Sequence, residues 1–274
     1  MRLAIDAGGT NLRAALFQDE KQVDFFKEKS SKIPLVKFIE EILKKYKQIK
    51  SIDISYAGQV RDGCIIDSPN IKVDTPNISE YFRKKHNIPL KIENDLTCAV
   101  IAEAKKLKSK NIAALYIGTG LGLGVIEDGK ILRGSTNMAT EIGHIPYLKT
   151  PLKCGCGRDN CLEIFASGSG IKKWIEYYGL ECEPTLEALK KGEKSQEILQ
   201  NFETALLYAV GTTITLFNPD TLVLGGGIIE ANPYLIDLVN SRVGEFCLKT
   251  SLKNCKIVGS DKIVGSGIYF LLFE

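Results

Sequence analysis

The sequence predicts an α/β protein made of two lobes with a central cleft. Its 274 residues approach the length that one hydrophobic core can fill, about 250–300 residues. A β-hairpin with a glycine-rich turn opens the chain near residue 6, and a second hairpin of the same kind begins near residue 118. We therefore expect a smaller N-terminal lobe over residues 1–108 and a larger C-terminal lobe over residues 109–274.

Strands and one amphipathic helix account for the first lobe. Residues 3–5 and 12–17 are apolar and flank DAGGTN, which predicts two antiparallel strands joined by a glycine turn, with a third strand over 23–27. The stretch from Pro34 has apolar residues at helical spacing, and SIDISYA after it is typical of a buried strand. In PLKIENDLTCAVIAEAKKL, a strand ends at EN and a helix follows Asp95.

The second lobe repeats this opening. NIAALYIGTGLGLGVIEDGKILRG predicts a strand, a glycine turn, a second strand and a short third one. A long buried helix is expected to end before Asn218, and TLVLGGGI predicts a buried strand that runs into three glycines. The tail GSGIYFLLF predicts a short C-terminal helix that packs back on the first lobe.

The composition is that of an ordinary globular protein, with 25% charged and 44% hydrophobic residues. The net charge of +3 offers no electrostatic reason to expect nucleic acid or a membrane as a partner. We find no secretion signal and no apolar run of about 18 residues, so we expect a cytoplasmic protein. In that reducing compartment, clustered cysteines indicate metal binding or catalysis rather than disulfides.

Three glycine turns follow buried strands: DAGGT, GTGLGLG and LGGGI. Each taken alone could be an ordinary hairpin turn. Glycine also allows close approach of the backbone, so that N–H groups can surround phosphate oxygens. Three such turns together favour a ligand with several anionic groups, such as a nucleoside triphosphate, although none matches the lysine-bearing P-loop or a dinucleotide fingerprint.

Asp95 lies where a predicted strand meets a predicted helix. Aspartate is a favoured helix N-cap, and that role alone would explain it. A carboxylate at such a junction can also accept the proton of a substrate hydroxyl. The two roles can coexist.

The four residues His144, Cys154, Cys156 and Cys161 have the spacing of a metal site. Three thiolates and one imidazole complete a tetrahedral Zn²⁺ shell, and a shell without a vacant position is structural rather than catalytic. The alternative is a set of inert buried cysteines, but the glycines and charged residues between them would make a poor core.

These motifs, DAGGTNLR, ENDLTCAVIAE, GTGLGLG, EIGH, CGCGRDNCLE and LVLGGGI, resemble those of the ROK family along nearly the whole chain and in the same order. EIGH together with the cysteine motif is the most specific part. The resemblance implies two RNase H-like lobes of the actin-like ATPase, or hexokinase, superfamily. Family repressors carry a helix-turn-helix before the first glycine turn; here that turn starts at residue 6, which favours an enzyme.

The resemblance also implies residue roles. Asp95 would be the general base, and Asp6 would orient Mg²⁺ through water, because that ion keeps much of its hydration. Three glycines, Gly225, Gly226 and Gly227, would let adenosine approach. The ATP phosphates would be held by Gly8, Gly9, Thr10, Gly118, Thr119 and Gly120.

The resemblance also implies sugar binding by side chains that can form hydrogen bonds with hydroxyl groups: Asn70, Asn94, Asp95, Glu141, His144 and Glu163. If zinc holds one imidazole nitrogen of His144, the other N–H can meet a sugar hydroxyl. The expected activity is ATP-dependent phosphorylation of a hexose or N-acetylhexosamine, glucokinase-like, with N-acetylmannosamine, N-acetylglucosamine or fructose as alternative substrates. A non-catalytic sugar-sensing regulator and a non-enzymatic zinc module are the alternatives from other classes. The expected partners are small molecules and a second copy of the chain in a homodimer.

Overall fold

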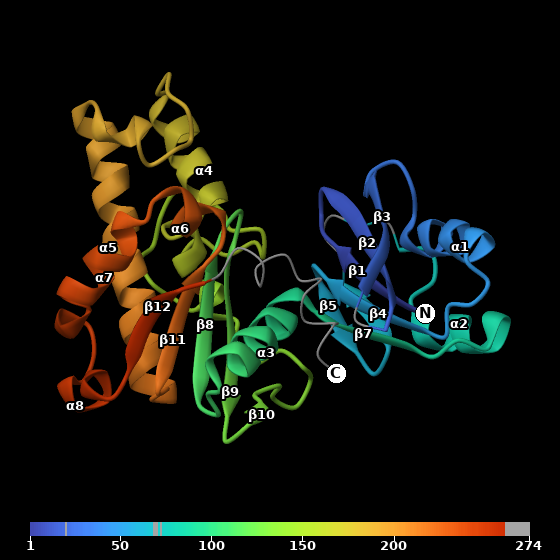
Figure 1. The fold of residues 1–274 in the computed structure, drawn as a ribbon. Helices are drawn as coiled ribbons and strands as arrows, with labels where there is room; N and C mark the ends of the chain where they lie inside the picture. The colour runs from blue at the N-terminus through green and yellow to red at the C-terminus, as the bar shows by residue number, and fades with distance from the viewer. Residues whose placement is uncertain (20, 68–70, 72, 261–274) are drawn as a thin grey trace. The chain divides into compact units, whose positions relative to one another are not determined.

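The computed structural model describes residues 1–19, 21–67, 71 and 73–260 (Figure 1). Within them, one compact unit comprises residues 1–102 and 133–139, and the other comprises residues 103–132 and 140–260. The lobe boundaries expected from the sequence stay a prediction, and the expected C-terminal helix lies outside the described residues.

The first unit is built on a mixed sheet in the order β3-β2-β1-β4-β7. Its strands are β1 (Arg2–Ala7), β2 (Asn11–Gln18), β3 (Lys21–Lys29), β4 (Ser51–Tyr56) and β7 (Leu90–Asn94). β1 pairs antiparallel with β2, and the strands β1, β4 and β7 are parallel. The carboxyl ends of these three strands therefore lie along one edge of the sheet.

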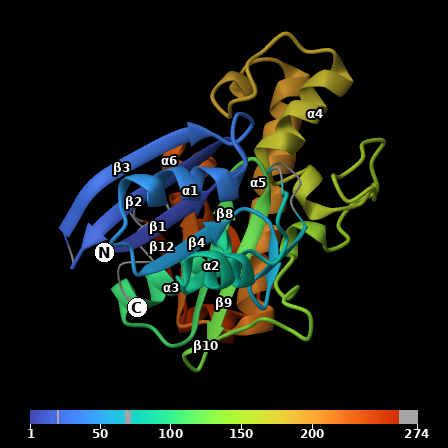
Figure 2. The same ribbon diagram turned by 90° about the vertical axis from the view of Figure 1, so that its right-hand side faces the viewer.

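Side chains alternate between the faces of this sheet, as the pleat requires. Leu3, Ile5 and Ala7 enter one hydrophobic core together with helices α1 (Leu35–Lys45) and α2 (Ile78–His86). Figures 1 and 2 show both helices beside the sheet. The side chain of Asp6 therefore points to the opposite face.

That opposite face meets helix α3 (Asp95–Leu107), which begins in the first unit and ends in the second. The thiol of Cys98 on α3 lies beside Ser55 of β4. Asp6 and the start of α3 consequently share a face of the sheet.

The second unit repeats the arrangement in the order β10-β9-β8-β11-β12. Its strands are β8 (Ile112–Ile117), β9 (Leu121–Glu127), β10 (Lys130–Ile131), β11 (Thr221–Gly225) and β12 (Lys256–Gly259). β8 is antiparallel to β9 and parallel to β11, which in turn is parallel to β12. The two hairpins predicted from the sequence are thus confirmed, and each starts a sheet of the same order.

Helix α5 (Glu193–Phe217) covers one face of this second sheet, where Leu115 and Ile117 join its core. Tyr116 points to the other face and donates its hydroxyl hydrogen to Glu103 of α3 at 3.2 Å. The helix ends where Asn218 takes a left-handed conformation, as predicted. In the described part of the chain, no helix is long and apolar enough to cross a bilayer.

Several shorter elements were not identified from the sequence, because their apolar runs are too brief to show a period. In the first unit they are the hairpin β5 (Gln59–Arg61) with β6 (Cys64–Asp67), and α2. In the second they are α4 (Gly168–Tyr178), α6 (Gly227–Ala231), α7 (Tyr234–Arg242), α8 (Lys249–Lys253) and the 3-10 turns Ile142–His144, Leu162–Ile164, Ala188–Lys190 and Val243–Glu245.

Candidate functional site

Two carboxylates meet at the carboxyl edge of the first sheet. Asp6 is the second-last residue of β1, and Asp95 follows β7 directly. The charge of Asp95, together with burial, raises the pKa of Asp6, and burial is the larger cause. The Arg13 guanidinium, 3.3 Å from Asp6, opposes this shift, and the resulting pKa is about 7. A half-buried carboxyl beside a second carboxylate is a place where a cation would offset charge.

The junction of β7 and α3 is held by Asn94. Its side-chain oxygen accepts the N–H groups of Leu96 (3.0 Å) and Thr97 (3.2 Å), and its amide nitrogen donates to the carbonyl of Gly58 (3.1 Å). Asn94 therefore caps α3, whereas we considered Asp95 for that role. Asp95 is the first helical residue, and its Oδ1 accepts the Leu96 N–H (2.9 Å). Because Asn94 supplies the cap, capping alone does not account for Asp95.

The glycine turn of the first unit is open on one side. The N–H of Gly8 donates to the carbonyl of Asn11 (3.0 Å), and Ser30 donates its hydroxyl to the carbonyl of Gly8 (2.6 Å). These two hydrogen bonds hold Gly8 in place, while Gly9 and Thr10 are exposed to solvent. The turn can accept an anion there with little rearrangement.

The glycine turn of the second unit rests on the start of α4. The N–H groups of Gly168 and Ser169 donate to the carbonyls of Gly118 (2.8 Å) and Thr119 (3.0 Å). A Cβ atom on Gly118 would meet nothing within 4 Å, whereas one on Gly120 would lie 2.7 Å from a carboxylate oxygen of Glu163. Gly118 thus leaves free space, and Gly120 makes room for Glu163.

The glycines of the third turn, residues 225–227, differ in their surroundings. Gly225 leaves room for the ring of Tyr116, and Gly226 has a φ of +93° with its Cβ position 2.5 Å from the carbonyl oxygen of Ile117. Close packing accounts for these two. Gly227 begins α6, and among the described residues no atom lies within 4 Å of its Cβ position, so it is the member of the run that leaves room for a ligand.

Glu163 connects three parts of the second unit. One carboxylate oxygen accepts the N–H of Leu121 at the end of the glycine turn (3.0 Å), and the other accepts the thiol hydrogen of Cys154 (3.6 Å). Its charge also raises the pKa of Glu141, for which desolvation is the largest cause and His144 acts in the opposite direction. Glu141, His144 and Glu163 therefore form one polar group, as the sequence suggested.

The predicted metal ligands converge. The ligand atoms of His144, Cys154, Cys156 and Cys161 all lie within 4.8 Å of one another. The Cys154 sulfur is 3.6 Å from Nδ1 of His144, and the sulfurs of Cys156 and Cys161 are 3.4 Å apart. A tetrahedral zinc with Zn–S bonds of about 2.3 Å would place its sulfurs about 3.8 Å apart. The cluster therefore fits a structural zinc ion, with Nδ1 of His144 facing it.

The thiols of this cluster differ in their pKa values in the protein without a bound ion. The backbone N–H of Arg158 is the main cause that lowers the pKa of Cys156 to about 6, whereas burial raises the pKa of Cys154 to about 12. Arg158 also donates to the carbonyl of His144 (2.6 Å) and so holds the loop closed. Zinc needs all three thiolates, and a divalent cation supplies the charge that ionises the buried ones.

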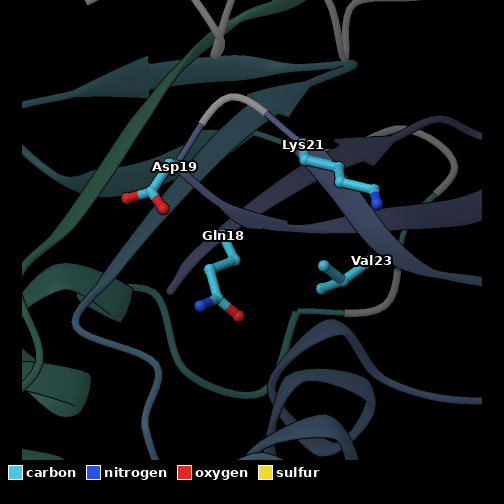
Figure 3. Close-up of a pocket in the computed structure, with 4 residues that line it drawn as sticks. All are labelled: Gln18, Asp19, Lys21 and Val23. Carbon is cyan, nitrogen blue, oxygen red and sulfur yellow. The ribbon is translucent and has the colours of Figure 1, made fainter.

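A surface pocket of about 720 Å³ lies at the turn between β2 and β3 of the first unit (Figure 3). It is lined by Gln18, Asp19, Lys21 and Val23. Phe17 pairs with Arg2 at the start of β1, so this pocket is at the opposite end of the sheet from Asp6. We assign it no part in the site.

The structure thus brings together Asp6, Asn94 and Asp95 in the first unit. In the second it brings together the turn at Gly118, the carboxylates of Glu141 and Glu163, and the candidate metal ligands. These ligands are His144, Cys154, Cys156 and Cys161. Asn70 lies outside the described residues. The sequence reasoning missed Arg13, Arg133 and Arg158, since arginines without a motif give no signal of their long-range partners.

The model of the ROK family matches residues 2–267. An N-acetylmannosamine kinase from Vibrio cholerae is 32% identical over 248 residues, which cover 85% of this chain and 86% of its own length. A glucokinase from Thermotoga maritima is 24% identical over 305 residues, with coverage of 97% and 94%.

Among solved structures, a ROK hexokinase from Thermus thermophilus has a similar fold. Its TM-score is 0.80 at 20% sequence identity, and the match covers 98% of this chain and 95% of that one. The hexokinase-type α/β fold expected from the sequence is confirmed. With the family model matching nearly the whole chain, the protein belongs to the ROK family.

Proposed function

We propose that the protein is an ATP-dependent sugar kinase that phosphorylates a hydroxyl of a hexose or N-acetylhexosamine. The observation that carries this proposal is the Asp6–Asp95 pair at the carboxyl edge of the first sheet, beside an exposed glycine turn. Phosphoryl transfer requires positioning, charge stabilisation and a base, with little covalent work by the protein. The kinases named among the relatives support the same activity.

Asp95 is the base in this proposal. Asn94 caps α3, and the Asp95 carboxylate beside it would take the proton from the attacking sugar hydroxyl. Asp6 would hold Mg²⁺, directly or through water, and the ion would neutralise charge on the ATP phosphates. Arg13 keeps Asp6 oriented from the other side.

The glycine turns hold the nucleotide in this proposal. Gly8, Gly9 and Thr10 in one unit and Gly118 and Thr119 in the other expose backbone groups that can bind phosphate oxygens. Gly227 leaves the open position for the adenosine part.

The zinc cluster orders the sugar-binding residues. Because Nδ1 of His144 faces the thiols, its Nε2 is the nitrogen left for a sugar hydroxyl. Glu163, two residues after Cys161, is carried by the same loop. Glu141 completes the set in the second unit.

N-acetylmannosamine is the first substrate to test, because the relative with 32% identity is named for it. The test is ADP formation with Mg²⁺ and ATP against N-acetylmannosamine, N-acetylglucosamine, glucose and fructose, with reactions lacking sugar as blanks. Sugar-dependent ADP formation with at least one of them is expected. Sugar binding without any turnover would favour the sugar-sensing regulator instead. The expected homodimer is a separate prediction that light scattering can check.

A further inference from the structure

The segment 133–139 belongs to a different unit from the chain on either side of it. Residues 103–132 and the chain from Thr140 lie in the second unit, whereas this segment is part of the first. It closes on itself, because the N–H of Ala139 donates to the carbonyl of Arg133 at 3.1 Å. Gly134, with a φ of +68°, provides the left-handed turn that this closure requires. The segment is a compact loop and not an extended linker.

Two side chains attach this loop to the first unit, one to β7 and one to β5 of the separate hairpin. Nη1 of Arg133 lies 2.5 Å from Oε2 of Glu93, and Nδ2 of Asn137 donates to the carbonyl of Val60 at 2.6 Å. Arg133 also donates to Oδ1 of Asn137 at 3.1 Å. Each attachment therefore orients the other.

Glu93 directly precedes Asn94 and Asp95 at the end of β7. Its second oxygen, Oε1, accepts the N–H of Asn94 at 3.0 Å. The carboxylate thus receives a backbone N–H on one oxygen and the Arg133 guanidinium on the other, which restricts its rotamer. With side chains that are 41% exposed for Arg133 and 20% exposed for Glu93, the pair adds little to global stability. The ion pair acts instead on local geometry, because it restricts the Glu93 side chain that binds the Asn94 N–H.

We propose that Arg133 is a positioning residue for phosphoryl transfer: it fixes Glu93, and through Glu93 the backbone at Asn94 that aims Asp95 at the acceptor hydroxyl. The inference rests on the proposed function, because it gives Asp95 the role of the base. The loop continues through Thr140 into Glu141, one of the proposed sugar ligands. This loop therefore contacts the strand that precedes Asp95 and continues along the sequence into Glu141.

The test compares Arg133→Met with Arg83→Met, which removes the same charge from an exposed position on α2. Arg133→Met should lower kcat about 10- to 100-fold, the usual cost of a misplaced reacting group. ATP affinity should stay within about twofold, and the melting temperature within about 3 °C. Arg133→Lys should recover part of kcat because it keeps the charge. Arg83→Met should behave like the wild type.

A double-mutant cycle with Glu93→Gln tests whether Arg133 acts on Asn94 and Asp95 through Glu93. Glutamine keeps an acceptor for the Asn94 N–H but loses the charge, so Arg133→Met combined with Glu93→Gln should be little worse than the poorer single variant. Additive losses would overturn the route through Glu93. Hydrogen exchange provides a readout without turnover: amides of residues 94–97 should exchange several-fold faster in Arg133→Met. Wild-type kcat and exchange in that variant would overturn the inference alone, whereas a wild-type protein that makes no ADP with any sugar would overturn the proposed function and this inference together.

Discussion

The two units of this protein share one sheet order and differ in what their carboxyl edges carry. In the first, β1, β4 and β7 end in side-chain chemistry, with Asp6 and Asp95 close enough for one charge to shift the other's pKa. In the second, the corresponding edge ends in backbone turns at Gly118 and Gly226. Its carboxylate, Glu163, comes from a zinc-type loop outside the sheet. In the proposed function, the first copy of this scaffold supplies the proton acceptor, while both copies supply backbone turns for the nucleotide.

The strongest test of this contrast is Asp95→Asn. We expect kcat to fall about 10²–10⁴-fold, the usual loss when a general base is removed, with sugar affinity within several-fold of the wild type. Asp74→Asn, which makes the same change at an exposed position, is the control. Steady-state ADP release and calorimetric sugar titration provide the measurements. Near-normal turnover of Asp95→Asn would show that the first unit does not supply the base.

The metal cluster should distinguish the second unit. Plasma mass spectrometry of the untagged protein should find one zinc per chain, and Cys156→Ala should lose it. We expect the KM for sugar to rise roughly tenfold or more, because Glu163 and His144 are held by this loop. Nucleotide affinity should change less, although the Glu163 bond to Leu121 links the loop to the glycine turn.

Cys64→Ala in the first unit is the matched control for that experiment. Full kinase activity without bound zinc would mean that the cluster is not a required metal site. Equal losses of sugar and nucleotide affinity would show instead that the loop supports the whole edge of the second sheet.

The pKa of Asp6 predicts a pH dependence that has no counterpart in the second unit's glycine turns. Burial raises this pKa from 3.8 to about 7, so the folded state favours the neutral carboxyl. The ligand-free protein should therefore lose stability from this group as the pH rises from about 4 to about 7. Asp6→Asn removes that loss, and we expect it to be more stable than the wild type by roughly 2–4 kcal/mol at pH 8. Urea unfolding at pH 4.5 and pH 8 measures the difference, which should nearly vanish at the lower pH; an equal difference at both would contradict the assignment.

The smallest effect is expected for Gly118→Ala. In the described part of the chain no atom lies within 4 Å of the added methyl group, so the melting temperature should change by less than about 2 °C. If the turn binds phosphate closely, the methyl group should raise the Kd for ATP about five- to tenfold. Gly244→Ala, exposed in the same unit, should change neither quantity. Unchanged ATP affinity in Gly118→Ala would remove this turn from the nucleotide site.

Much of the candidate site could be predicted because its parts are local in sequence. The turns DAGGT and GTGLGLG follow apolar strands, and both hairpins form as expected. Cys154, Cys156 and Cys161 are close enough along the chain for one small loop to collect them, and they converge with His144. Asp95 shows where local reasoning reaches its limit, since aspartate and asparagine are both good caps and only the hydrogen bonds show that Asn94 fills the role.

The sequence by itself determined the two hairpins, the glycine turns and the His–Cys quartet, because hydrophobic period, backbone freedom and ligand spacing act over a few residues. Only the tertiary structure decided which distant groups meet. The parallel order of β1, β4 and β7 places Asp6 beside Asp95, and the return of the loop 133–139 to the first unit pairs Arg133 with Glu93. Such contacts depend on strand order and on the path of the chain between units, which no short stretch of residues encodes.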